Sequence, residues 1–197
     1  VNDEYTKVDK DNDACVVNIY QKGEPLAVES SLYLNDLYAY TFPCSTSNRF
    51  YYGMGEAHYA FDVNDYASFM PHLVYEGVRV FIDEAKSFPS FATVGISSSF
   101  DSATREVSVD VSGDIADEAP AIFGDMALTI MLAEDNIVGN QLMGGTVVSK
   151  KYVHNQVLRA YMTQPQGDKI TNDNGKYAAH YTYTLPAEWK DADIKVV

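Results

Sequence analysis

The sequence predicts an α+β protein: residues 1–89 form a mixed helix and strand unit, and residues 90–197 form an antiparallel β-sandwich. Two observations carry this prediction. A long amphipathic pattern ends at Phe88-Pro89, and beyond it the sequence changes to short strand patterns separated by turns. Composition agrees, because 15 Tyr and 9 Phe against a single Trp favour sheet structure.

The clearest helix is predicted over Phe69–Lys86. Its apolar residues recur at intervals of four and form one stripe, whereas the charged residues lie mostly off that stripe. Upstream we predict a buried strand over residues 15–20, because it is short and rich in β-branched residues. A helix over residues 26–38 and a strand-like segment over residues 46–52 complete the first unit.

This order of elements fits the later part of a thioredoxin-like domain, lacking its first strand and helix. Such a domain holds a cis-proline before a strand, which makes Pro43 the structural cis-proline candidate. Cys44 follows directly and would face the redox loop, where it could support redox or disulfide chemistry with an upstream Cys-X-X-Cys. The alternative, which we favour, is a structural cysteine that packs as a small hydrophobe.

The second unit is predicted from alternation and turn residues. In Arg105–Val111 three valines occupy one face and polar residues the other. A turn over Asp101–Thr104 precedes this strand, and a hairpin turn over Thr171–Gly175 precedes the last one. The other predicted strands are Thr93–Phe100, Met126–Ala133 and Tyr177–Leu185.

Charge excludes one class of partner. The chain has 28 acidic and 14 basic residues, a formal net charge of −14, so it would repel a nucleic acid backbone. Anionic lipid surfaces are disfavoured for the same reason. No apolar run approaches the ~20 residues of a membrane-spanning helix.

One stretch, Lys151–Ala160, matches neither the helical nor the strand period and mixes a histidine, an amide and an arginine with apolar residues. An acid–base or metal site is one interpretation, but zinc needs three or four ligands and only His154 is evident. We instead predict a buried corner in which Arg159 pairs with Glu134 or Asp135 and fixes the register of neighbouring strands. The residues of this predicted structural motif are Glu134, Asp135, Tyr152, His154, Asn155 and Arg159.

Other catalytic and ligand signatures are weak. No Gly-X-Ser-X-Gly elbow or phosphate-binding glycine loop occurs, so we predict no catalytic residue, no metal site and no cofactor. Tyr51 and Tyr52 stand in a segment whose composition is typical of sugar-binding or protein-binding loops. They are therefore candidate binding residues, with ordinary β-sheet tyrosines as the alternative.

Together these segments resemble the outer membrane protein 28-related family, surface or outer-membrane lipoproteins of Bacteroidetes. The specific part of the resemblance is the pair Ala133–Gln141 and Tyr152–Ala160. Weaker matches are Gly23–Ala27, Pro43–Arg49 and Phe100–Val107.

The resemblance extends over roughly residues 15–197 and implies a thioredoxin-like part followed by a β-rich part, with no established catalytic residues. It implies a non-enzymatic accessory or binding lipoprotein at the outer membrane or cell surface, held only through an upstream lipid anchor. Expected partners are other envelope proteins, a nutrient-uptake complex among them. Two alternatives stay open: a thiol–disulfide oxidoreductase whose Cys-X-X-Cys lies upstream of Val1, and a glycan-binding surface protein.

Overall fold

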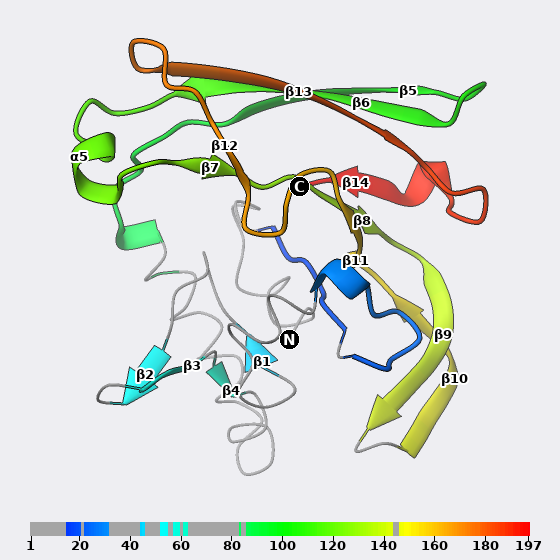
Figure 1. Ribbon diagram of the computed structural model, residues 1–197. Coiled ribbons are helices and arrows are strands. Elements are labelled where there is room, and N and C mark those ends of the chain that lie inside the picture. Colours follow the sequence, from blue (N-terminus) through cyan, green and yellow to red (C-terminus); the bar gives the residue numbers. More distant parts are fainter. Residues whose placement is uncertain are drawn as a thin grey trace. The chain divides into compact units, whose positions relative to one another are not determined.

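The computed structural model describes residues 15–20, 22–31, 44–45, 52–54, 57–59, 61–62, 83, 86–143 and 146–197. The chain divides into two compact units, Val1–Pro89 and Ser90–Val197. Each unit has its own antiparallel strand pairs (Figure 1).

In the first unit, short strands pair two by two. They are β1 (Cys44–Ser45) with β4 (Phe61–Asp62), and β2 (Tyr52–Met54) with β3 (Ala57–Tyr59). Asp83, Lys86 and Ser87 are helical, and the rest of the helix predicted over Phe69–Lys86 lies outside the described residues. Most of the predicted thioredoxin-like arrangement lies outside them too.

Two predictions for this unit need correction. Residues 15–20 do not form a strand: within them a β-bridge occurs at Asn18 alone, because β-branched residues make a strand only where a neighbour completes the ladder. The predicted helix does not begin at Leu26, because a turn closed by the Ala27 N–H on the Glu24 carbonyl (3.0 Å) occupies that position. Helical structure first appears as the 3₁₀ turn η1 (Glu29–Ser31).

The first sheet of the second unit has the strand order β13-β6-β5 and is antiparallel throughout. Its strands are β5 (Gly95–Asp101), β6 (Glu106–Asp114) and β13 (Lys176–Thr184). The alternation predicted for the central strand is confirmed, since Val107, Val109 and Val111 are all buried. A two-residue turn at Asn174-Gly175, both with positive φ, leads into β13, as the hairpin signal predicted.

The second sheet has the strand order β11-β8-β14, and a separate pair is formed by β12 and β7. The strands are β7 (Ala127–Leu128), β8 (Met131–Glu134), β11 (Val157–Tyr161), β12 (Asp168–Lys169) and β14 (Ile194–Val196). Met126–Ala133 was predicted as one strand, but it divides in two because β7 pairs with β12 and β8 pairs with β11 and β14. At the break, the Ile130 N–H donates to Thr163 Oγ1 (3.1 Å) in place of a ladder bond.

The two sheets share one hydrophobic core, which makes the second unit a β-sandwich (Figure 1). Val109 and Val111 of the first sheet and Leu132 of the second are no more than 2% exposed. Residues between and after the strands, among them Leu185 and Trp189, close the core. The helical elements among the described residues of this unit are α5 (Ala119–Phe123) and the 3₁₀ turn η2 (Asp191–Asp193).

A two-stranded ribbon extends this sandwich. β9 (Ile137–Met143) continues from β8, and β10 (Thr146–His154) returns into β11, so that the ribbon runs on beyond the second sheet (Figure 1). β10 carries two irregularities in its pairing, one between Val147 and Ser149 and one between Ser149 and Tyr152. Among the described residues, no helix is long and apolar enough to cross a membrane.

Candidate functional site

The candidate site is the corner where the sandwich becomes the ribbon. Strand pairing runs up to Glu134 opposite Val157 and resumes with Ile137 opposite His154. The two residues between these pairs on each strand are unpaired in the ladder. Asn136 and Gln156, the second residue on either side, have φ values of 58° and 55°. This left-handed conformation is uncommon for residues other than glycine. It changes the direction of both strands within the same unpaired segment of the hairpin.

Side chains take over the backbone hydrogen bonds at this corner. The Asn136 N–H donates to Asn155 Oδ1 (3.0 Å), and the Gln156 N–H donates to Asp135 Oδ1 (2.7 Å). Short Asp and Asn side chains are suited to such local exchange. The corner is therefore fixed by its own residues, in both strands at once.

The C-terminal segment, from η2 into β14, contacts the same corner from outside the hairpin. The Asp135 N–H donates to the Asp193 carbonyl (3.0 Å), and Asn136 Nδ2 donates to Asp193 Oδ1 (2.9 Å). Lys195 forms an ion pair with Asp135. Burial acts to raise the pKa of the Asp135 carboxyl, but the hydrogen bonds from Lys195 and from the Gln156 N–H, with the Lys195 charge, hold the pKa below its ordinary value.

A buried carboxylate lies directly beside the turn. Glu134 is 4% exposed, and its Oε2 is 3.2 Å from Arg159 Nε. Its Oε1 accepts the Lys190 N–H at 3.2 Å. Of the two carboxylates expected to pair with Arg159, Glu134 makes the contact, whereas Asp135 pairs with Lys195.

The guanidinium of Arg159 also lies over an aromatic stack. Its Cζ is 4.8 Å from the ring centroid of Trp189, and that ring stacks on Tyr183 at 5.9 Å. Arg105 holds the segment around Trp189 in place by donating to the carbonyls of Leu185 (3.2 Å), Pro186 (3.1 Å) and Trp189 (2.8 Å). A cation over a desolvated indole is stabilised by the ring quadrupole.

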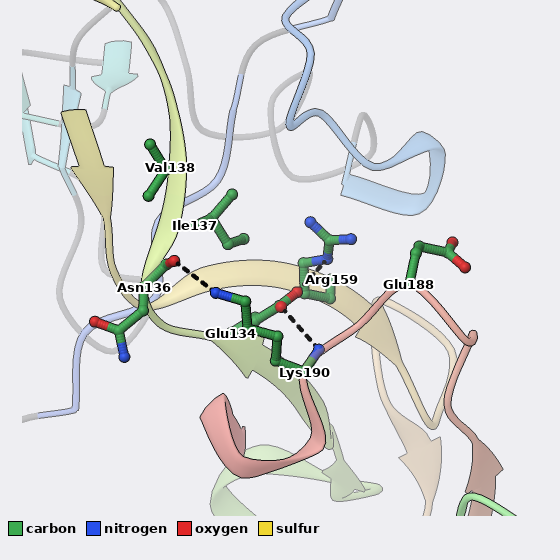
Figure 2. Close-up of a pocket in the computed structure, with 7 residues that line it drawn as sticks. All are labelled: Glu134, Asn136, Ile137, Val138, Arg159, Glu188 and Lys190. Carbon is green, nitrogen blue, oxygen red and sulfur yellow. Dashed lines mark hydrogen bonds and ion pairs between the residues drawn. The ribbon is translucent and has the colours of Figure 1, made fainter. Parts of the chain in front are cut away.

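These groups border a shallow, open pocket of about 320 Å³ (Figure 2). Figure 2 shows the terminal nitrogens of Arg159 directed away from Glu134. Lys190 Nζ reaches the Asn136 carbonyl at 3.5 Å, and Glu188 lies on the opposite side of the pocket. The residues that line the pocket are Glu134, Asn136, Ile137, Val138, Arg159, Glu188 and Lys190. The lining offers both charge signs and two apolar side chains, which suits a polar contact from another molecule.

The predicted motif residues divide between two places. Glu134, Asp135, Asn155 and Arg159 meet at the corner, as described above. His154 is 2% exposed and packs edge-to-face on Tyr152 with ring centroids 4.9 Å apart, one step into the ribbon. A methyl group on Gly139, the residue opposite Tyr152, would come within 3.4 Å of His154 Nε2, so this ring fills the space above the glycine.

The candidate residues of the first unit are placed only by their backbone. Cys44 lies in β1 opposite Asp62, and Tyr52 lies in β2 opposite Tyr59. Pro43 and Tyr51 lie outside the described residues. The redox and glycan-binding interpretations of these residues stay predictions.

Several residues of the corner escaped the sequence analysis, among them Asn136, Gln156, Trp189 and Lys190. Asn136 and Gln156 could have been found, because each follows an Asp or Asn, the residue types that bond to nearby backbone groups. Trp189 and Lys190 carry no such signal, since the topology alone brings them beside Glu134. Across the described ranges, no group of three or more His, Cys, Asp or Glu side chains is arranged to hold a metal ion.

Comparison with known proteins agrees with the motif resemblance. The family model described as outer membrane protein Omp28 matches residues 33–197. No curated sequence matches the chain. Among solved structures, HBP35 of Porphyromonas gingivalis is similar, with a TM-score of 0.60 at 14% identity. The similarity covers 85% of this chain and 49% of that one, so the chain spans about half the length of HBP35, and the likeness shows the fold alone.

Proposed function

The chain belongs to the Omp28 family of outer membrane proteins, and we propose that it is a non-enzymatic accessory protein that binds other proteins of the cell envelope. Association with the outer membrane follows from the family. The binding role is our proposal, and the pocket beside the Glu134–Arg159 pair is the observation that carries it.

Three properties of the pocket support a protein partner. Its volume of about 320 Å³ is at the low end of small-molecule sites, which run to roughly 1,000 Å³, so it suits one or two side chains. Arg159 and Lys190 line it together with Glu188, and a lining with both charge signs favours a partner with the complementary charge pattern. Its walls are held in place by the hydrogen bonds of the corner, so little side-chain ordering is required on binding.

The proposal includes a lipid anchor and a defined class of partner. A lipid group on a cysteine upstream of Val1 would hold the protein at the outer membrane or cell surface. The partners would be envelope proteins, with a nutrient-uptake complex as the first to test. Mass spectrometry of the mature N-terminus tests the anchor, and an N-terminus without lipid contradicts it.

The binding role is tested by photo-crosslinking in intact cells. A photoreactive amino acid replaces Glu188 in the full-length protein, and a matched variant carries it at Ser112, which is exposed on the far side of the first sheet. We expect adducts with envelope proteins from position 188 and not from position 112, after gentle detergent extraction. Equal adducts from both positions, or none from either, contradict the proposal.

A further inference from the structure

The β9–β10 ribbon reverses the charge of the rest of the chain. The whole protein carries 28 acidic residues, yet neither Asp nor Glu occurs anywhere from Asn136 to Gly167. The ribbon itself contains Lys150 and Lys151, adjacent and both exposed. It is therefore a basic projection from an acidic protein.

The same ribbon exposes apolar side chains on both faces. Val138 and Val153 are opposite each other in the ladder and so share one face, and they are 63% and 45% exposed. Tyr152 is one residue along and so points to the other face, where it is 45% exposed. Val147 and Val148, nearer the tip, are exposed as well. Apolar residues gathered at this density mark an interaction surface.

The irregular pairing of β10 concentrates these features on one strand. Between Val147 and Ser149 the strand gains Val148, and between Ser149 and Tyr152 it gains one residue of the Lys150-Lys151 pair. Such bulges re-aim side chains out of the strict alternation of a ladder. Lys150, Lys151 and four of the five exposed apolar residues that the structure describes in the ribbon therefore lie on one strand, β10.

Local charge governs what this ribbon meets. Lys150 and Lys151 lie between the levels of Gly139 and Gln141 in the ladder, so at about 3.4 Å per residue they are roughly 14–20 Å along the ribbon from Asp135. The screening length at physiological salt is about 8 Å, so the carboxylates of the sandwich are largely screened at the lysines. The net charge of −14, which argues against anionic lipid for the whole molecule, does not decide the behaviour of the ribbon.

We propose that the β9–β10 ribbon docks into the headgroup region of a bilayer that contains anionic lipid. Lys150 and Lys151 contact the phosphates, and the valines and Tyr152 enter the boundary with the acyl chains. A protein groove would cover one face of a ribbon, whereas a bilayer surrounds both faces, and the apolar residues lie on both. Tyrosine is also a residue enriched at membrane interfaces.

Co-sedimentation with vesicles of pure lipid tests this proposal on the full chain. We expect binding to vesicles of phosphatidylcholine with phosphatidylglycerol, weaker binding to phosphatidylcholine alone, and a loss of binding as salt is raised. Replacing Lys150→Ala and Lys151→Ala together should weaken binding by about tenfold or more. Vesicles contain no protein, so the outcome is independent of the proposed envelope partner. The chain Val1–Val197 is prepared without a lipid group, so the outcome is also independent of the proposed anchor.

Matched variants give the controls. Lys169→Ala with Lys176→Ala changes the net charge equally, at exposed lysines that are ion-paired with Asp125 and Asp114, and should bind as wild type. Val148→Ser with Val153→Ser should lose affinity. Ile96→Ser with Phe100→Ser, at two exposed apolar residues of β5, should not.

A polarity-sensitive fluorophore on Val148→Cys, with both native cysteines changed to Ser, should shift to shorter wavelength when anionic vesicles are added. The same fluorophore on Ser112→Cys should not shift. Absence of binding to anionic vesicles, equal losses in ribbon and control variants, or binding of the ribbon to envelope proteins without vesicle binding overturns the proposal.

Discussion

Asp135 and Asn155 play the same part on opposite strands of one hairpin. Each precedes a residue with positive φ, and each accepts the N–H of the positive-φ residue across the hairpin, Gln156 for Asp135 and Asn136 for Asn155. The corner thus has a local two-fold relationship that joins the halves of the motif Glu134–Asn136 and His154–Gln156. Because each half completes the other, we expect the two to be coupled energetically.

Removing one of the two side-chain acceptors tests this pair of reciprocal hydrogen bonds, which we call the clasp. Asn155→Ala leaves the Asn136 N–H without its side-chain acceptor, and we expect a loss of about 0.5–1.5 kcal/mol in the free energy of unfolding. Urea denaturation measures the change. The matched variant Asn140→Ala, at an exposed asparagine of β9, should stay within about 0.5 kcal/mol of wild type. Equal effects at the two positions would refute the clasp.

The backbone conformation of the corner makes an opposite prediction. Gln156 has a φ of 55°, so Gln156→Gly removes a conformational penalty and should be neutral or stabilising by up to about 1 kcal/mol. Asn140→Gly, within the extended β9, should destabilise by about 0.5–1 kcal/mol because glycine loses more freedom on folding. Thermal unfolding distinguishes the two signs. A destabilised Gln156→Gly would show that the side chain matters more than the turn.

Asp135 should contribute a pH-dependent part of the stability. Its pKa is held below the ordinary value of 3.8, so its ionised form stabilises the fold above the pKa of the unfolded chain. This stabilisation should be lost as the pH falls through the lowered folded-state pKa. Asp135→Asn keeps an acceptor for Gln156 but carries no charge, so it should be less stable near pH 7 and approach wild type near pH 2. A constant difference across urea titrations at these pH values would contradict the assignment.

The Glu134–Arg159 pair should be costly to break. Arg159→Ala leaves a carboxylate that is 4% exposed without its cation, and we expect a loss of about 3–5 kcal/mol. Trp189 is the single tryptophan and lies against Arg159, so its fluorescence reports both unfolding and the local change.

Two variants bracket the expected effect of Arg159→Ala. Arg159→Lys keeps the charge but not the planar group and should fall between wild type and Arg159→Ala. Lys169→Ala, which breaks an exposed pair with Asp125, should cost less than about 1 kcal/mol. A loss that small for Arg159→Ala would mean that solvent or Lys190 replaces the arginine.

The features that could be predicted are those that depend on residues close together in the sequence. The valines of β6 alternate strictly, and a two-residue period with one apolar face admits only one placement in a sandwich. The segment around His154 indicated a corner, because apolar and hydrogen-bonding residues are mixed there and follow neither the helical nor the strand period. The resemblance to the Omp28 family is likewise confirmed over residues 33–197.

The other features depend on pairing between distant segments. β9 shows no alternation, with Gly139, Asn140 and Gln141 at its centre, and becomes a strand because β10 pairs with it. Met126–Ala133 divides because β12 pairs with its first part, whereas β11 and β14 pair with its second part. The thioredoxin-like arrangement of residues 1–89 stays a prediction.

The direction in which the ribbon leaves the sandwich and the length of the ribbon are set by different residues. Direction is set by the residue pairs Asp135-Asn136 and Asn155-Gln156, whereas reach is set by how many residues follow them. Removing one residue from each strand would shorten the ribbon by about 3.4 Å and exchange its two faces, and removing two from each would shorten it by about 7 Å and restore them. The ribbon can therefore be lengthened or shortened in steps of two residue pairs, while the corner from which it starts stays unchanged.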